Sequence, residues 1–201
     1  MPVDPTNNIS DFTNAMAGGG VRSNLFLVTG NIPGYDNNKA ISFLCKAAQI
    51  PASSLGTIEI PYRGRKIKIP GDRTFQDWSI TIISDANMNL RGAFEHWSAR
   101  FNSHIGNVGP NEFMQFMPTW SVTQLYRTGD ALRTYNFIGC FPSEIGAIDL
   151  SFENTDQIAE FPVTLNYSYW VASGGSSVPS NGSPDIEQLL SAAGINIGNG
   201  F

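Results

Sequence analysis

The chain has 201 residues and a formal net charge of −5, and only 14% of its residues are charged, while 41% are hydrophobic. An average soluble domain has roughly 25% charged residues, but this composition can still form a packed core and excludes disorder over most of the chain. Residues 1–133 carry 12 basic and 10 acidic side chains, a net +2, and residues 134–201 carry seven acidic and no basic ones, a net −7. A generally basic nucleic-acid-binding protein is excluded, although one local patch can still be basic.

The first predicted elements are a flexible arm and two strands. Residues 1–20 are polar and end in three consecutive glycines, which is typical of an arm joined to a folded body. Residues 22–29 and 40–46 are rich in strand-forming side chains and are separated by a turn-rich segment, so each predicts a β-strand.

The segment 47–75 combines three prolines and three glycines with two short alternating stretches, 57–60 and 66–69. Five of the 12 basic residues fall within it: Arg63, Arg65, Lys66, Lys68 and Arg73. One interpretation is a solvated β-hairpin in a long loop. The other is a functional loop, because a long structured loop inside a compact domain is usually functional.

Further strands are predicted downstream. Residues 77–83 alternate between apolar and polar side chains, and residues 119–127 and 132–141 predict a hairpin that Pro142 ends. Residues 161–171 show the strongest alternation, with one apolar and aromatic face and one small polar face, and predict a single long strand.

One amphipathic helix is predicted between these strands. Leu90, Phe94, Trp97 and Phe101 follow a helical spacing, and Asn89 is the expected N-cap. The stripe is expected to pack on the sheet. The sequence thus predicts a mainly β domain at 21–171 with one flanking helix.

The composition changes again after residue 171. Residues 172–201 begin with a Gly/Ser-rich linker, and Ser183, Pro184 and the apolar residues up to Ala193 predict a short amphipathic helix. A helix this short is marginal alone. Its apolar stripe is therefore expected to dock either on its own body or on a neighbouring chain.

The search for chemistry returns no catalytic pattern. Cys45 and Cys140 lie far apart outside any CxxC pattern and are expected to be reduced and structural, and His96 and His104 lack ligand or triad partners in the sequence. The acidic group Glu144, Asp149, Glu153, Asp156 and Glu160 fits neither a calcium loop nor a paired-carboxylate motif, so a solvated acidic surface is preferred. We expect no enzyme activity, cofactor or metal.

No leader segment or membrane-spanning stretch is expected in the sequence, so the protein is predicted to be made and kept in a cytoplasm.

The low content of charged residues suits extensive protein–protein interfaces. Opposite charges on different parts of one chain favour head-to-tail contacts, which close into rings or grow into filaments. Self-association is one hypothesis; a monomeric binding module or an enzyme on a β-sandwich, which would need a deep polar pocket, is the other.

Several segments carry a more specific signal. They are SSLGTIEIPYRGRKIKIPGDRTFQDWSITII at 53–83, RGAFEHWSARFN at 91–102, VTQLYRTGDALRTYNFIGCFPSEIGAIDLSF at 122–152 and EFPVTLNYSYW at 160–170. In this order, over about residues 20–171, they resemble the tail tube proteins of T4-like contractile-tailed bacteriophages. The IPYRGRKIKIPGDRTF stretch is the most specific part of the resemblance.

This resemblance implies two packed antiparallel sheets in a sandwich or barrel-like body, with six copies closing into a ring and rings stacking into a tube. The implied partners are further copies of the chain, the sheath outside, the tape measure protein and then DNA in the lumen, and the baseplate hub and terminator at the ends. The implied location is the virion tail, assembled in the host cytoplasm. The alternative is an inner tube of a phage-like bacteriocin, an extracellular contractile injection system or a type VI secretion system.

The resemblance also assigns residues. It makes 47–75 an inter-subunit loop whose five basic residues face acidic partners, for which Asp149, Glu153 and Asp156 are the candidates, and it makes the arm 1–20 a second candidate for contact between rings. Polar strand faces are expected to line a lumen that does not hold DNA. The candidate lining residues are Asp77, Ser79, Thr81, Ser121, Thr123, Thr134, Asn136, Glu160, Thr164, Asn166 and Ser168.

Overall fold

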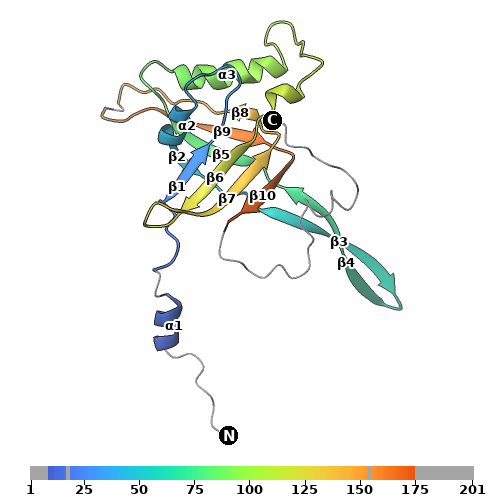
Figure 1. Ribbon diagram of the computed structural model, residues 1–201. Helices are drawn as coiled ribbons and strands as arrows, with labels where there is room; N and C mark the ends of the chain where they lie inside the picture. The colour runs from blue at the N-terminus through green and yellow to red at the C-terminus, as the bar shows by residue number, and fades with distance from the viewer. Residues whose placement is uncertain (1–8, 17–18, 154, 175–201) are drawn as a thin grey trace, which may run out of the picture.

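In a computed structural model of the chain, which describes residues 9–16, 19–153 and 155–174, two four-stranded antiparallel sheets pack face to face (Figure 1). The first sheet has the order β1 (Phe26–Thr29), β6 (Trp120–Leu125), β7 (Ala131–Ile138), β10 (Tyr169–Ser173). The second has the order β2 (Cys45–Ala48), β5 (Trp78–Ile83), β9 (Glu160–Asn166), β8 (Phe141–Ile145). The mainly β sandwich predicted from the sequence is confirmed.

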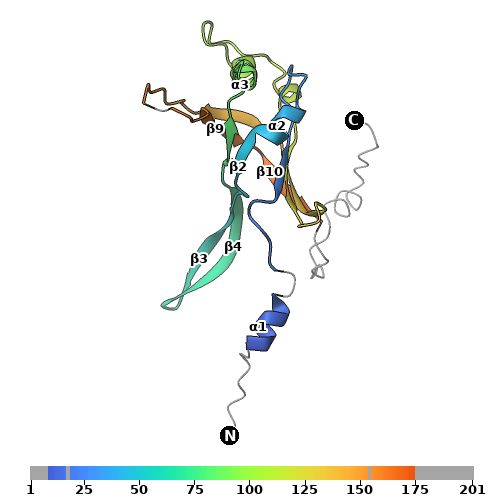
Figure 2. The same cartoon turned by 90° about the vertical axis from the view of Figure 1, so that its left-hand side faces the viewer.

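Three further features surround the sandwich, as Figures 1 and 2 show. Helix α3 (Asn89–Phe101), followed by the short 3-10 helix η1 (Met114–Phe116), covers one end of the body. The hairpin of β3 (Ser53–Tyr62) and β4 (Arg65–Phe75) and the short helix α1 (Ile9–Ala15) extend from the opposite end. Among the described residues, no helix has the length and apolar character needed to cross a membrane.

Aromatic rings from both sheets and from α3 fill the core. Trp78 of the second sheet stacks on Phe137 of the first at a centroid distance of 4.3 Å, and Trp97 of α3 stacks on Trp120 at 5.9 Å with their planes 3° apart. The indole nitrogens of Trp78 and Trp97 donate to the carbonyls of Gln49 and Phe116. The core thereby fixes the two sheets and α3 as one body.

The predicted helix is confirmed, with a different cap. Leu90, Phe94 and Trp97 are fully buried. The Asp85 carboxylate, rather than Asn89, accepts the first backbone N–H groups, those of Asn89 and Leu90, both at 3.1 Å. An acidic side chain at this end also complements the helix dipole.

The strand predicted at 40–46 is wrong, because residues 39–44 form helix α2 (Lys39–Leu44) and only Cys45 starts the strand β2. The Asn38 side chain accepts from the Ile32 N–H and donates to the Asn31 side chain, and so braces the turn before the helix. Helical spacing then brings Ile41 and Cys45 to the core together and leaves Phe43 83% exposed.

The single long strand predicted at 161–171 is also wrong in part. The chain leaves the second sheet after β9, turns at Tyr167 and Ser168, and enters the first sheet as β10. The side-chain phase changes at this crossing, so that Trp170 packs against the core while Tyr169 and Val171 are exposed. A pattern that continues smoothly in the sequence therefore hides a change of sheet.

A second crossing occurs in the predicted strand 132–141. Strand β7 ends at Ile138, Gly139 takes a φ of 71°, and β8 begins at Phe141 in the other sheet. Pro142 does not end a strand, because it lies buried within β8 opposite Leu165. The positive φ at the crossing suits glycine, which has no Cβ to clash there.

The predicted ends of the chain are only partly described. Helix α1 lies within the arm 1–20 and was not predicted from the sequence. Of the predicted linker and C-terminal helix at 172–201, only residues 172–174 are described, the first two of them as the end of β10. The predicted helix at 183–193 lies outside the described residues.

Candidate assembly surfaces

The hairpin β3–β4 has two chemically different faces. Ile58 pairs with Ile69 and Ile60 with Ile67 across the strands, so four isoleucines share one face. Their exposed fractions lie between 42% for Ile69 and 55% for Ile58. A two-stranded ribbon without a second layer is marginal in water. This isoleucine face, defined by these four residues, therefore lacks a packing partner within the described residues.

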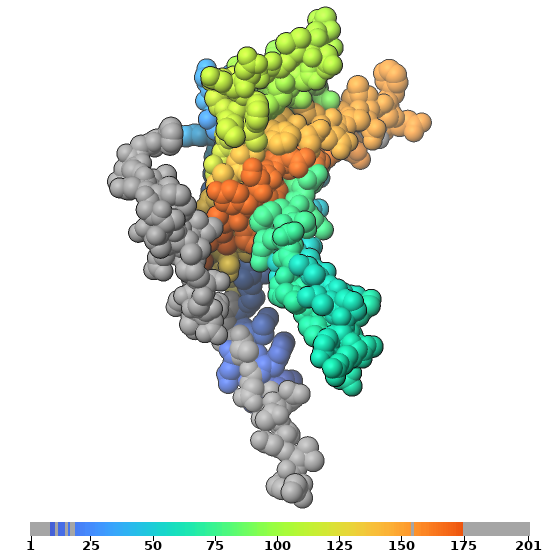
Figure 3. All heavy atoms as spheres, turned by 90° about the vertical axis from the view of Figure 1, so that its right-hand side faces the viewer, coloured from blue at the N-terminus to red at the C-terminus, as the bar shows by residue number. Residues whose placement is uncertain are grey.

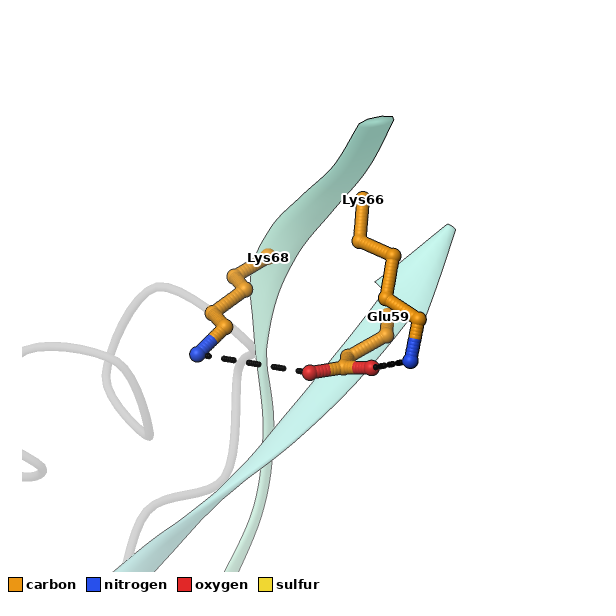
Figure 4. Close-up of polar contacts among 3 residues, drawn as sticks. All are labelled: Glu59, Lys66 and Lys68. Atoms are coloured by element: carbon orange, nitrogen blue, oxygen red, sulfur yellow. Dashed lines mark hydrogen bonds and ion pairs between the residues drawn. The ribbon is translucent and has the colours of Figure 1, made fainter. Parts of the chain in front are cut away.

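The opposite face carries an ion cluster, shown in Figure 4. The Lys66 Nζ lies 2.7 Å from the Glu59 Oε2, and the Lys68 Nζ lies 4.0 Å from the Glu59 Oε1. Two of the basic residues predicted to meet a neighbouring chain thus contact an acid of their own hairpin. They remain well exposed, so a second acidic partner can still reach them.

The tip and the base of the hairpin are set by backbone geometry. Arg63 and Gly64 have positive φ values of 45° and 81°, as a two-residue turn that matches the strand twist requires. The pairing shifts between Leu55 and Thr57. Gly56 and Gly71 approach closely at this irregularity, where a Cβ on Gly71 would lie 3.2 Å from the Gly56 backbone. The hairpin projects from the body as a separate two-stranded ribbon (Figure 3).

The remaining predicted basic residues lie along the same hairpin. The Arg63 guanidinium stacks over the Tyr62 ring at 5.4 Å, and an Arg73 guanidinium nitrogen donates to the Ser53 hydroxyl at 3.1 Å. Arg65 pairs across the turn with Tyr62. Residues 53–75 contain five basic and two acidic residues, a net +3.

The loop 146–159 between β8 and β9 has the complementary properties. It contains Asp149, Glu153 and Asp156 and no basic residue, and it also exposes the apolar side chains of Leu150 and Ile158 at 88% and 71%. This acidic loop lies nearer the α3 end of the body, away from the hairpin, as Figures 1 and 3 show. No ion pair joins the loop to the hairpin in the described part of the chain. Both surfaces are therefore available to other molecules.

The predicted lumen residues do not share one surface. The first sheet turns Ser121, Thr123, Thr134 and Asn136 outward, away from the core. Thr123 and Thr134 are hydrogen-bonded at 3.0 Å, and Thr29, which the sequence prediction missed, is bonded to Ser121. Among the described strand positions this outward face bears no charged residue.

The second sheet turns the other predicted residues outward on the opposite side of the sandwich: Ser79, Thr81, Glu160, Thr164 and Asn166. Glu160 forms an ion pair with Lys46 at 2.6 Å. Glu144, opposite Thr164, is the second acidic residue on this outward face. Asp77 precedes β5 and Ser168 lies in the crossing to β10. Because the two outward faces point in opposite directions, only one of them can line a single channel.

Known proteins resemble this chain in sequence and in fold. The phage tail tube protein family matches residues 12–173. The chain belongs to the phage tail tube protein family. It is 28% identical over 164 residues to the tail tube protein gp19 of Enterobacteria phage T4, covering 81% of this chain and 98% of that protein. It is 28% identical over 169 residues to the tail tube protein of Serratia phage KSP90, covering 79% and 93%.

Solved structures share the fold of this tail tube family member. A chain in the anti-feeding prophage baseplate aligns with a TM-score of 0.60 at 11% identity, covering 79% of this chain and 98% of that one. A chain in the sheath–tube complex of the extracellular contractile injection system PVC aligns with a TM-score of 0.55 at 18% identity, covering 81% and 97%. The family match contains the hairpin, the acidic loop and both sheets. It leaves residues 174–201 outside.

Proposed function

We propose that this chain is the structural subunit of the inner tube of a phage tail, with six copies closing into a ring and rings stacking through the hairpin and the acidic loop. The observation that carries the proposal is the complementarity of these two surfaces, which lie in separate regions of the same folded body. One has a net +3 and four exposed isoleucines, and the other has three acids and exposed apolar side chains. A head-to-tail contact buries both, and it repeats without limit along an axis.

Ring closure has a natural route in the two sheets. Within the described residues, each sheet ends in strands with one unpaired edge, β1 and β10 in the first sheet and β2 and β8 in the second. Pairing of such edges between neighbours removes the exposed backbone groups that otherwise promote uncontrolled association. A closed ring of this kind turns one outward sheet face toward the axis.

The lumen lining follows from the same geometry. The outward face of the first sheet has no charged residue among the described strands, and that of the second has Lys46, Glu144 and Glu160, a net −1. Neither face has surplus positive charge, so either one lets a phosphate backbone pass without binding it. This supports a conduit for genome DNA that the tape measure protein occupies first.

The other partners follow from the family. The structurally similar chains belong to a baseplate and to a sheath–tube complex, and we propose the sheath, the baseplate hub and the tail terminator as partners of this chain. The role is structural and involves no catalysis or cofactor, within a virion tail assembled in the host cytoplasm. The sequence relatives are phage proteins, which favours a phage tail over a DNA-free injection device.

Negative-stain microscopy of the full-length protein over a concentration series tests the proposal. We expect tubes or six-fold rings for the wild type. Ile67→Asp places a charge on the isoleucine face and should abolish tubes while the circular dichroism spectrum stays unchanged. The matched control Thr57→Asp places the same charge on the opposite face of the same hairpin and should still assemble.

Two outcomes contradict the proposal. If the wild-type protein stays monomeric at every concentration, the proposal that it is a tube subunit is wrong. Normal tubes from Ile67→Asp would leave the tube intact but exclude the isoleucine face from its contacts. Release of DNA through the tail when isolated particles are triggered distinguishes a phage tail from an injection device that carries no DNA.

A further inference from the structure

A second unpartnered apolar surface lies at the hairpin end of the body, where residues 20–25 pass the turn between β6 and β7. The apolar side chains of Val21, Leu25, Leu125 and Leu132 line it, and Tyr126 flanks them. Val21 is 65% exposed. We call this surface the foot groove. The contacts proposed above for the hairpin and the acidic loop do not use it.

The rim of the foot groove is basic. Arg22 and Arg127 both line it, and neither forms an ion pair in the described part of the chain. No acidic residue is among the residues that line it. The groove therefore suits an apolar stripe flanked by carboxylates.

The described chain ends beside this groove. Ser173, the last residue of β10, pairs with Thr134 on β7. Gly174 has a φ of 81°, and a Cβ placed on it would lie 3.4 Å from the carbonyl oxygen of Leu132, one of the groove residues. Gly174, which 27 further residues follow in the sequence, thus lies beside the groove.

The sequence that follows has the matching chemistry. Residues 183–193 combine the apolar side chains of Ile186, Leu189 and Leu190 with Asp185 and Glu187, and they contain no basic residue. All basic residues of the chain precede residue 134, so no counter-charge for these carboxylates lies in the C-terminal third of the sequence. Arg22 and Arg127 form no ion pair with any described residue and line the groove together with Leu132, beside the point where β10 ends.

We propose that residues 183–193 dock in the foot groove of their own chain, with their apolar stripe on Leu125 and Leu132 and their acids toward Arg22 and Arg127. Eight residues, 175–182, connect Gly174 to this segment. A flexible linker of that length spans about 15 Å on average, enough to reach an adjacent groove. The short tether also gives an effective concentration in the millimolar range.

Tethering answers the objection that so short a helix is marginal in water. A weak apolar contact is sufficient when the segment cannot diffuse away, and docking then supplies the tertiary packing that stabilises the helix. The competing occupant is α1 of a second copy, whose Ile9 and Phe12 are exposed. The C-terminal segment is favoured because its two acids match the basic rim and because its tether begins at the groove.

Cross-linking of the full-length, freshly purified protein before assembly tests the proposal. Cys45 and Cys140 are both buried, so introduced thiols dominate the reaction. The pair Thr128→Cys with Ser191→Cys should form an intrachain product with a short bismaleimide. The control pair combines Ser191→Cys with Asn37→Cys, and Asn37 lies at the α3 end of the body. This pair should form no intrachain product. Equal yields from the two pairs, or an interchain product instead, would overturn docking on the same chain.

Three further variants, the last of them a charge-reversal rescue, test the chemistry. Adding Leu189→Asp and Leu190→Asp to the reactive pair should lower the intrachain yield to that of the control. Adding Arg127→Glu should lower it by about two- to fivefold, the range for one exposed ion pair, and Glu187→Lys should restore it. A yield that changes neither with the two aspartates nor with Arg127→Glu would overturn the proposed contacts.

Discussion

The body and the hairpin of this protein use the same apolar cross-strand pairing and differ in where the second layer comes from. In the body, Trp78 and Phe137 face each other across two sheets of one chain. In the hairpin, Ile58 and Ile60 pair just as regularly with Ile69 and Ile67, yet nothing in the described chain covers them. The body can therefore fold by itself, whereas the hairpin depends on a neighbour for its packing.

The difference separates folding from assembly. A substitution in the body removes buried contacts that the isolated chain already has, so the free energy of unfolding falls. A substitution on the isoleucine face removes contacts that form only between chains, so the critical concentration for assembly changes. Stability and assembly should accordingly be affected by different sets of residues.

The largest expected effect on the body comes from Trp120, which is fully buried and packs on Trp97 and Phe94. Trp120→Ala should lower the free energy of unfolding by about 3–5 kcal/mol, as large-to-small changes in cores do. Urea unfolding of the unassembled protein measures this loss. The hairpin counterpart Ile60→Ala should stay within about 1 kcal/mol and impair assembly instead.

Trp120→Phe provides the matched control within the core. The indole nitrogen of Trp120 is buried without a hydrogen-bond partner in the described structure. An unpaired buried N–H costs about 1–3 kcal/mol, so phenylalanine keeps most of the ring contacts and removes that cost. A loss as large as that of the alanine variant, or an equal loss for Trp120→Ala and Ile60→Ala, would contradict the separation of body and hairpin.

The second largest effect on the body is expected at alkaline pH, where the free energy of unfolding should fall. Burial raises the pKa of the Cys45 and Cys140 thiols from 9.0 to about 12, and burial, followed by Asp77 and Cys140, raises the pKa of Tyr167 from 10.0 to about 12. The unfolded chain loses these protons at lower pH than the folded chain. The stabilisation is therefore complete below pH 9 and is lost as the pH rises toward 12.

Urea unfolding at a series of pH values measures this dependence. Each thiol should contribute a slope of up to about 1.4 kcal/mol per pH unit above pH 9. Cys140→Ala lowers stability at pH 8 by its own packing loss, but its slope above pH 9 should be shallower than that of the wild type. An identical slope in the two proteins would show that Cys140 does not contribute to the pH dependence.

Much of this fold could be predicted from local patterns. The alternation at Trp78, Ile80 and Ile82 and the stripe of Leu90, Phe94 and Trp97 identified the buried faces of β5 and α3, because each face is decided within one element. The hairpin was likewise indicated by its own turn and alternation. These elements need no knowledge of distant residues.

The errors arose where distant residues decide the structure. At Gly139 and at Ser168 the chain changes sheets, and the neighbouring strands, not the local pattern, determine which side chains then face the core. The same limit applies to the predicted lumen residues. Alternation tells which residues share one face of a strand, but not that the outward faces of two packed sheets point in opposite directions. The Lys66–Glu59 pair depends on cross-strand register, and the sequence prediction missed it.

The smallest expected effect concerns that ion cluster and sharpens the role of the hairpin. Glu59→Gln should change the free energy of unfolding by less than about 1 kcal/mol, because all three members of the cluster are exposed. It raises the hairpin charge from +3 to +4 and frees Lys66 and Lys68 for the acidic loop of a neighbouring chain. The critical concentration for tubes, measured by sedimentation, should therefore fall about two- to fivefold at low salt.

High salt should abolish this difference, since the exposed charges are then screened. Glu144→Gln is the matched control, because it removes one acid from the second sheet that forms no ion pair in the described residues. A higher critical concentration for Glu59→Gln would mean that Glu59 holds the lysines in the geometry that assembly needs, and not that it competes with the neighbouring loop. The side chains of the hairpin would then already be held in place in the isolated chain, as those of the body are, and would not depend on a neighbouring chain for their arrangement.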